Sequence, residues 1–431
     1  MIKNSTLFFY GILGVPIAFL GFPLYIYLPP FYVEHIGLNI GFVGVILLFA
    51  RLIDMIADPF IGRFCDIYSS KFKIILISSI FLLISLYFLI KPISNSYFYL
   101  FIFSIITYIS YSFVLIPYLS LNAILGKNEF DNTKLAFSRE IFIIFGVLLS
   151  LLLPYIFLVS SDSKKSLELL LLFVLIIFPI ALIIFYKKLK SLEIKSENIA
   201  LNTFFKSLKT LFKSYPNQKK LFFAFLFNSL ANALPATLFL FFVKYVLILE
   251  EHTGLFLIIY FLSAIVAFPI WIKISKRISK KSTWILSICV AIGAFIFVSF
   301  LNEGDFFFFS IICMLTGACL GADMAIPSSI QADVANFIKQ KEDLTSVLFG
   351  FWAMITKLSL AFAIAISFIT LEFTGFDKQN INEYSIFAII FLYSTLPIVF
   401  KIFAIFFLNR YEMTKWVYKT IEIYNKLLNL N

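Results

Sequence analysis

The chain has 431 residues, of which 61% are hydrophobic and 14% are charged, with a formal net charge of +11. Soluble globular proteins carry roughly 25% charged residues, so this composition excludes an ordinary soluble domain and favours an integral membrane protein. A basic chain can bind nucleic acid, but positively charged loops on one side of a membrane explain the excess without such a partner.

Twelve apolar stretches follow one another along the chain, each long enough to span a hydrocarbon core of about 30 Å. Unpaired backbone groups are not tolerated in lipid, so every stretch is expected to be a helix. The predicted fold class is therefore an all-α integral membrane protein with twelve transmembrane helices. They are expected near residues 7–32, 42–62, 74–93, 97–125, 141–159, 166–186, 221–249, 254–272, 284–300, 306–334, 347–373 and 386–408.

The longest polar stretch, residues 187–220, contains nine lysines and separates two groups of six helices. Within it, residues 204–213 alternate apolar side chains and lysines at helical spacing, which is typical of a helix lying on the inner membrane surface. Two six-helix halves with such a linker resemble the plan of the major facilitator fold, whose site lies between the halves. The expected division is an N-terminal half at 1–186, a cytoplasmic linker at 187–220, a C-terminal half at 221–408 and a cytoplasmic tail at 409–431.

The distribution of basic residues predicts the orientation. Roughly 27 of the 35 Lys and Arg lie at the N-terminus, after even-numbered helices or in the tail, against about 4 in the alternate loops. Both termini are therefore expected in the cytoplasm, and the protein in the inner (cytoplasmic) membrane of the cell as a multi-pass protein.

The second predicted helix contains Arg51, Asp54 and Asp58, which lie within about 60° of one another on one helix face. Charges at membrane depth are costly and usually mark an ion or substrate path. Arg51 and Asp54 could instead form a simple intrahelical ion pair. Asp58 would then call for a proton, a bound cation or a lysine from another helix, which favours a cation-coupled transporter.

The loop after this helix contains Gly62, Asp66 and Lys71. Glycine permits close packing at the helix end, and the acid with the basic residues can form a charge latch on the cytoplasmic side. This loop resembles, in reduced form, the glycine–aspartate–basic loop of the major facilitator superfamily. The alternative is a tight turn with solvated charges.

Among the other charged residues within predicted helices, four bear on the function: Asp323, Lys357, Lys244 and Lys401. Asp323 and Lys357 lie deep, so they are candidates for charge coupling, with Lys357 able to compete with a cation for the carboxylates. Lys244 and Lys401 lie nearer helix ends and are expected to snorkel to the interface.

The pattern Arg51-x-x-Asp54-x-x-x-Asp58-Pro59-x-x-Gly62 resembles the signature of the glycoside–pentoside–hexuronide:cation symporters, the family of melibiose permease. The resemblance implies that Asp54 and Asp58 help to bind Na⁺, Li⁺ or H⁺; these two residues form a metal site, for Na⁺, only if the transporter is sodium-coupled. It also implies that Lys357 couples the halves and that Arg139 contacts substrate. Weaker matches follow in the same order along the chain: Ile116-Pro117-Tyr118, Arg139, Ala332-Asp333-Val334 and Thr356-Lys357-Leu358.

The chain departs from the sugar-transporting members at three positions. Ala18 and Leu115 stand where those members have aspartates, and Leu119 stands where they have a tryptophan. Losing hydroxyl-binding groups weakens the inference to a sugar. Asn228 and Asn232, four residues apart in the seventh helix, together with Tyr118, are alternative substrate contacts, although such residues more often link helices.

The sequence thus predicts a cation-coupled (Na⁺ or H⁺) secondary transporter of a small organic solute, with a sugar or glycoside as one candidate. An exporter or a carrier of amphipathic, lipid-like solutes is the first alternative. An integral-membrane enzyme is less favoured, because no nucleophile–base pair, His-rich metal set or phosphate-binding glycine loop is found. We expect no cofactor, a lipid bilayer environment and a monomer; the substrate, the ion and the direction are left open.

Overall fold

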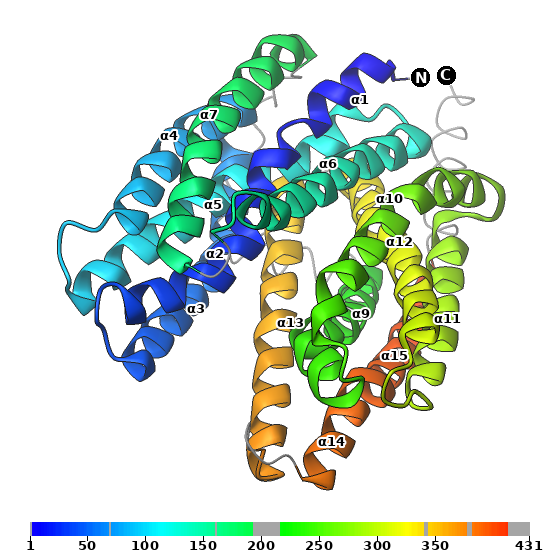
Figure 1. Cartoon of the computed structure of the whole chain (residues 1–431). Coiled ribbons are helices and arrows are strands. Elements are labelled where there is room, and N and C mark those ends of the chain that lie inside the picture. Colours follow the sequence, from blue (N-terminus) through cyan, green and yellow to red (C-terminus); the bar gives the residue numbers. More distant parts are fainter. Residues whose placement is uncertain are drawn as a thin grey trace, which may run out of the picture. The chain divides into compact units, whose positions relative to one another are not determined.

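The computed structural model describes residues 2–68, 70–159, 162–192, 216–339, 344–376 and 382–412, and these ranges contain helices and no strand (Figure 1). The predicted surface helix at 204–213 lies outside them. The elements of the first part are α1 (Asn4–Gly11), α2 (Gly14–Glu34), α3 (Ile40–Ile67), α4 (Lys71–Ile90), α5 (Tyr97–Leu125), α6 (Glu129–Ile156), α7 (Ser163–Leu189) and η1 (Lys190–Leu192).

The second part has the same all-helical character. Its elements are α9 (Pro216–Phe241), η2 (Phe242–Val246), η3 (Glu250–His252), α10 (Thr253–Ile278), α11 (Lys280–Val298), α12 (Phe306–Lys339), α13 (Thr345–Phe373), α14 (Glu383–Ile390), η4 (Phe391–Thr395) and α15 (Leu396–Arg410). Both η2 and η4 are π-helical turns; η2 ends the helical segment that begins with α9, and η4 joins α14 to α15.

The described helices confirm the prediction of twelve membrane-spanning segments. Eleven of them are long and apolar enough to cross a membrane; these do not include α3, whose apolar stretch contains Arg51, Asp54 and Asp58. The first segment is broken into α1 and α2, the seventh runs from α9 into η2, and the twelfth consists of α14, η4 and α15.

The chain forms two compact units. The first comprises Met1–Leu201 and Gln331–Met354, and the second comprises Asn202–Ile330 and Ile355–Asn431. Both α12 and α13 therefore contribute residues to each unit. The predicted boundaries of the halves, 1–186 and 221–408, stay predictions.

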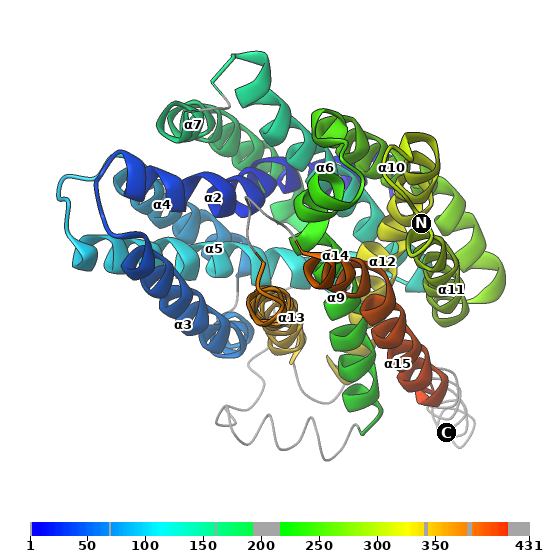
Figure 2. The same ribbon diagram turned by 60° about the horizontal axis from the view of Figure 1, so that its bottom comes forward.

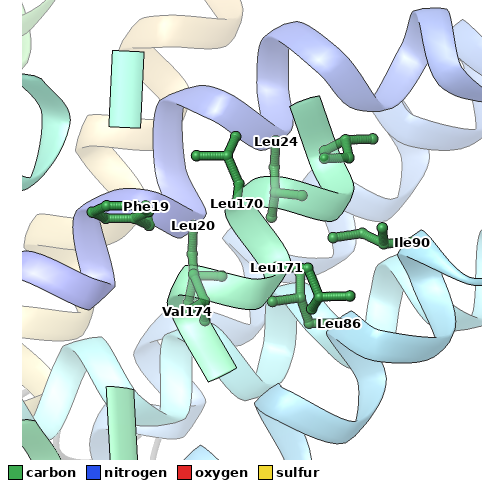
Figure 3. A pocket seen from close by; sticks show the side chains of 9 residues that line it. Phe19, Leu20, Leu24, Leu86, Ile90, Leu170, Leu171 and Val174 are labelled. Atoms are coloured by element: carbon green, nitrogen blue, oxygen red, sulfur yellow. The ribbon is translucent and has the colours of Figure 1, made fainter. Parts of the chain in front are cut away.

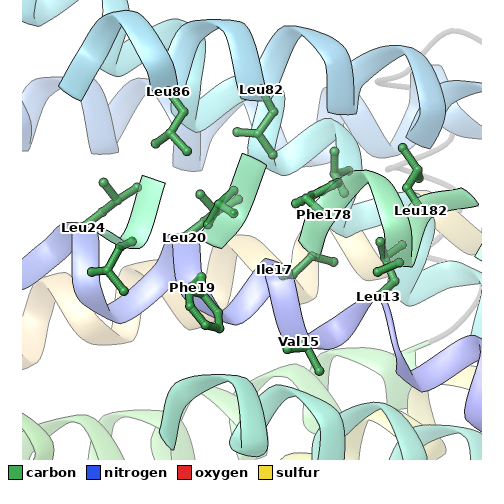
Figure 4. Packing of buried hydrophobic residues seen from close by; sticks show 14 of the residues in the cluster. Leu13, Val15, Ile17, Phe19, Leu20, Leu24, Leu82, Leu86, Phe178 and Leu182 are labelled. Carbon is green, nitrogen blue, oxygen red and sulfur yellow. The ribbon is translucent and has the colours of Figure 1, made fainter. Parts of the chain in front are cut away.

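Within the first unit, α4 packs along α5, α3 also packs on α5, and α2 lies against α6 and α7 (Figure 2). Leucine and phenylalanine side chains from α2, α4 and α7 form its core, among them Leu20, Leu82 and Phe178 (Figure 4). Within the second unit, α15 packs against α9 and α11.

Small residues allow the closest of these contacts. A Cβ on Gly146 of α6 would come within 2.5 Å of the Val15 carbonyl oxygen on α2, and one on Gly317 of α12 would clash with the Tyr260 carbonyl on α10. Close backbone approach of this kind helps helices to associate in lipid, because lipid tails are as apolar as the side chains and the hydrophobic effect does not drive the helices together.

Candidate functional site

An apolar void lies among α2, α4 and α7 (Figure 3). It is lined by leucines together with Phe19, Ile90 and Val174, and none of the described side chains that line it is polar. Such a void has no group that could recognise the polar part of a solute. The candidate site is therefore built from the buried charged residues.

Asp54 and Arg51 both meet α5. Asp54 is fully buried and its Oδ1 accepts a hydrogen bond of 2.6 Å from the Ser112 hydroxyl. The Arg51 guanidinium lies over the Tyr108 ring, 4.0 Å from its centroid, which is a cation–π contact. The charged face predicted for α3 thus points at the polar face of α5.

Asp58 lies one turn further along α3 and is also fully buried. Here α13 comes so close that a Cβ on Gly350 would lie 2.5 Å from the main-chain oxygen of Asp58. Pro59 follows inside the helix and has no N–H to give to the preceding turn. The backbone of Asp58 therefore packs against the first turns of α13 within the first unit.

The predicted gating loop also meets α13. Asp66 accepts hydrogen bonds from the backbone N–H groups of Ser346 (2.7 Å) and Val347 (2.9 Å), at the N-terminus of that helix. Lys71 forms an ion pair with Asp66 at 3.2 Å. A carboxylate at a helix N-terminus satisfies otherwise unpaired N–H groups and complements the helix dipole. Gly62 has no side chain where the Ser346 carbonyl packs.

Arg139 and Tyr118, both predicted to contact substrate, lie in one buried network in the first unit. Arg139 is paired with Glu140, its neighbour on α6, at a distance of 3.0 Å from Nε to Oε1. Its Nη1 lies 3.4 Å from the hydroxyl of Tyr10. Tyr118 donates its hydroxyl to the Tyr10 carbonyl, and Tyr10 donates to the Tyr118 carbonyl.

Asp323 lies in a second polar network, within the second unit. Its Oδ2 lies 3.1 Å from the Lys401 Nζ and accepts a hydrogen bond from Asn232 Nδ2 (3.0 Å). Its Oδ1 accepts hydrogen bonds from the Trp284 indole N–H (3.2 Å) and the Ser287 hydroxyl (3.4 Å). Helices α9, α11, α12 and α15 each supply at least one member.

The expectation that Lys401 snorkels to the interface is wrong. Lys401 is fully buried because α15 packs on α9, and its ammonium contacts the side-chain oxygens of Asn228 (3.1 Å) and Asn232 (2.9 Å) as well as Asp323. The asparagines proposed as substrate contacts thus hold this lysine. Lys244 does lie partly exposed and pairs with Glu250 at 2.8 Å.

Lys357 lies in the part of α13 that belongs to the second unit, and it is half-buried. The carboxylates it is expected to couple, Asp54 and Asp58, lie in the first unit, so this pairing stays a prediction. Sequence reasoning names Ser112 only as one of several polar residues of the fourth predicted helix, and it missed Glu140 and the partnership of Lys401. Glu140 directly follows Arg139 in the chain, so its position next to a predicted site residue was the available signal.

Apolar helices that bury charged residues within the described part of the chain are typical of multi-pass transporters. The family model described as MFS/sugar transport protein matches residues 9–415, and the chain belongs to this family. Two transporters of known structure are similar to it in fold. A bacterial homologue of the iron transporter ferroportin, in the outward-facing state, has a TM-score of 0.71 at 11% identity, covering 94% of this chain and 99% of that one. The Escherichia coli fucose:proton symporter has a TM-score of 0.68 at 11% identity, covering 95% and 98%. At this identity the likeness shows the fold alone.

Relatives similar in sequence include lipid transporters. The sodium-dependent lysophosphatidylcholine symporter 1-A of Danio rerio is 28% identical over 162 residues, which are 37% of this chain and 30% of that protein. The Homo sapiens sodium-dependent lysophosphatidylcholine symporter 1 is 28% identical over 193 residues, 44% and 35% respectively. The sphingosine-1-phosphate transporter MFSD2B of Mus musculus is 24% identical over 165 residues, 37% and 33%. The chain matches about a third of the length of each of these relatives.

Proposed function

We propose that this transporter is a cation-coupled symporter in which Asp54 and Asp58 hold Na⁺ or H⁺. The observation that carries the proposal is that two fully buried carboxylates lie one turn apart on α3, with the Ser112 hydroxyl 2.6 Å from the first. Carboxylate and hydroxyl oxygens are hard ligands of the kind that alkali and alkaline-earth cations prefer. Carboxylates that share a buried site also favour an added proton.

The charges on α3 support a role for a monovalent ion. Asp54 and Asp58 carry two negative charges, and Arg51, held over Tyr108, carries one positive charge. One Na⁺ or H⁺ brings this set to neutrality. Lys357 is proposed as its competitor, so that the carboxylates interact with the lysine when the cation is absent. Competition of this kind couples ion binding to conformation.

For the cargo we favour an amphipathic, lipid-like solute. Ala18 is buried, and its Cβ lies close to the position that a Cβ on Gly146 would take, so the α2–α6 contact has no space for a sugar-binding carboxylate. Leu115 packs against the apolar core. The similarity to sodium-dependent lysophosphatidylcholine symporters supports both the ion and the cargo. A sugar is the second candidate, supported by the description of the family model and by the α3 pattern shared with melibiose permease-like symporters.

The remaining predictions complete the proposal. The lysine distribution supports cytoplasmic termini in the inner membrane. Asp66, with Gly62 and Lys71, holds the N-terminus of α13 and would act as a cytoplasmic gate. Arg139 would contact the polar part of the solute. Asp323 would hold Lys401 and Asn232 in place in the polar network of the second unit. A single bundle of this class requires no second copy.

Uptake into proteoliposomes tests the proposal. Radiolabelled lysophosphatidylcholine and melibiose are offered with an inward Na⁺ gradient, with a proton gradient and with neither. We expect one of the two gradients to drive accumulation, and Asp58→Asn and Asp54→Asn to abolish it. Glu303→Gln, a change to an exposed carboxylate in a loop, is the matched control and is expected to behave as wild type.

Two outcomes would contradict the proposal. Gradient-driven accumulation at the wild-type level in both aspartate variants would exclude these carboxylates from ion binding. Uptake of melibiose but not of lysophosphatidylcholine would replace the preferred cargo with the second candidate.

A further inference from the structure

Arg139 and Glu140 form a buried ion pair between adjacent residues of one helix. The Nε and Nη2 atoms of Arg139 lie 3.0 and 2.5 Å from the same Glu140 oxygen, and only 1% and 5% of the two residues is exposed. On the other side of the guanidinium, Nη1 faces the hydroxyl of Tyr10 at 3.4 Å. The reciprocal hydrogen bonds of Tyr10 and Tyr118 hold that hydroxyl in place. The cation therefore has a fixed orientation and its own counter-ion.

We propose that Glu140 is a specificity-determining residue that keeps the net charge around Arg139 near zero and so excludes solutes whose polar group is a net anion. The inference rests on the proposed function, in which Arg139 contacts the polar part of the solute. It names the class of that group: uncharged or zwitterionic.

The physical reason is the cost of like charges in a medium of low dielectric constant. A buried arginine alone would bind a phosphate or carboxylate through two parallel hydrogen bonds. In this protein one Glu140 carboxylate oxygen already accepts hydrogen bonds from two of the guanidinium nitrogens. An anion must either displace this carboxylate or lie beside its negative charge, and both are unfavourable. A hydroxyl or a zwitterion adds no net charge and avoids that cost.

Binding of two matched lipids to the full-length protein in nanodiscs tests the inference. The probes are lysophosphatidylcholine, whose headgroup is zwitterionic, and lysophosphatidic acid with the same acyl chain, whose headgroup is a net anion. We expect Glu140→Gln to raise the affinity for the anionic lipid relative to the zwitterionic one at least tenfold. Glu140→Asp, which keeps the charge, is expected to retain the wild-type ratio.

An unchanged ratio in Glu140→Gln, or binding of neither lipid by this variant, would overturn the inference. If Glu140→Gln does not fold, the neutral double variant Arg139→Gln/Glu140→Gln replaces it. This variant also has a net charge near zero at the site, and it has no cation to compensate an anion, so the discrimination against the anion is expected to be retained. Its loss would overturn the inference. Loss of ion dependence in uptake would contradict the cation role of Asp54 and Asp58, which this binding measurement does not involve.

Discussion

Neutralising Lys401 alone should destabilise the protein far more than neutralising Lys401 and Asp323 together. The two charges lie 3.1 Å apart and fully buried, which corresponds to about 5 kcal/mol of attraction at an effective dielectric constant of roughly 20. The three ammonium protons also meet three acceptors, on Asn228, Asn232 and Asp323. In Lys401→Met the carboxylate keeps its burial and loses its counter-ion, so we expect a loss of about 3–5 kcal/mol of unfolding free energy.

The double variant Lys401→Met/Asp323→Asn removes both charges, and the new amide oxygen still accepts from Trp284 and Ser287. Its NH₂ group can donate to the Asn232 oxygen, which no longer binds Lys401, once the Asn232 amide turns over. Replacing a buried ion pair by neutral groups is often close to neutral, so we expect this variant to lie within about 1 kcal/mol of wild type. Thermal unfolding in detergent, followed by tryptophan fluorescence, ranks the four proteins in a double-mutant cycle. If the double variant were destabilised by the sum of the single changes, the two residues would not act as a pair, and the reasoning would be refuted.

Three further changes test the first unit. Ser112→Ala removes the hydroxyl that donates to Asp54. Because a hydrogen bond to a charged group contributes about 1.5–3 kcal/mol, half-maximal uptake should require on the order of tenfold more coupling ion. An unchanged ion requirement would exclude Ser112 from the ion site. Asp66→Asn weakens the cap of α13 and also removes the charge that pairs with buried Lys71, so it should cost about 3–5 kcal/mol, measured by thermal unfolding. Asp66→Glu keeps the charge and should retain part of the stability. The backbone N–H of Lys165 lowers the pKa of Asp162 below its ordinary value of 3.8. The ionised Asp162 therefore stabilises the protein above pH 3.8, and this stabilisation is lost as the pH falls through the lower pKa of the folded state. Asp162→Asn should flatten this part of the profile of Tm against pH, and a profile identical to wild type would contradict the prediction.

The positions of the helices followed from local properties of the chain. An apolar stretch of about twenty residues in lipid has only one way to satisfy its backbone, so the twelve segments could be predicted without knowing their neighbours. The break between α1 and α2 and the π turns of η2 and η4 were not predicted, because they interrupt the helix without interrupting the hydropathy.

Partnerships between helices were beyond the reach of the sequence. Lys401 was placed at the interface from its distance to a helix end, whereas its burial depends on three other helices that meet α15. Asp66 was identified as a latch, but its partners Ser346 and Val347 lie 280 and 281 positions further along the chain. The α3 carboxylates could be found because a charge within an apolar stretch is visible by itself, while Ser112 looks like any other helical serine until α5 is placed beside α3.

The packing of α13 gives the α3 carboxylates a route to the rest of the molecule. Gly62 and Gly350 let the backbones of α3 and α13 touch beside Asp66 and Asp58, and Asp66 holds the first N–H groups of α13. The same helix continues into the second unit, where it carries Lys357. A packed contact between two backbones cannot deform gradually, so a change in the charge of Asp58 acts on a rigid element rather than on a flexible side chain. Under the proposed function, α13 is therefore the element through which occupancy of the ion site would reach the second unit.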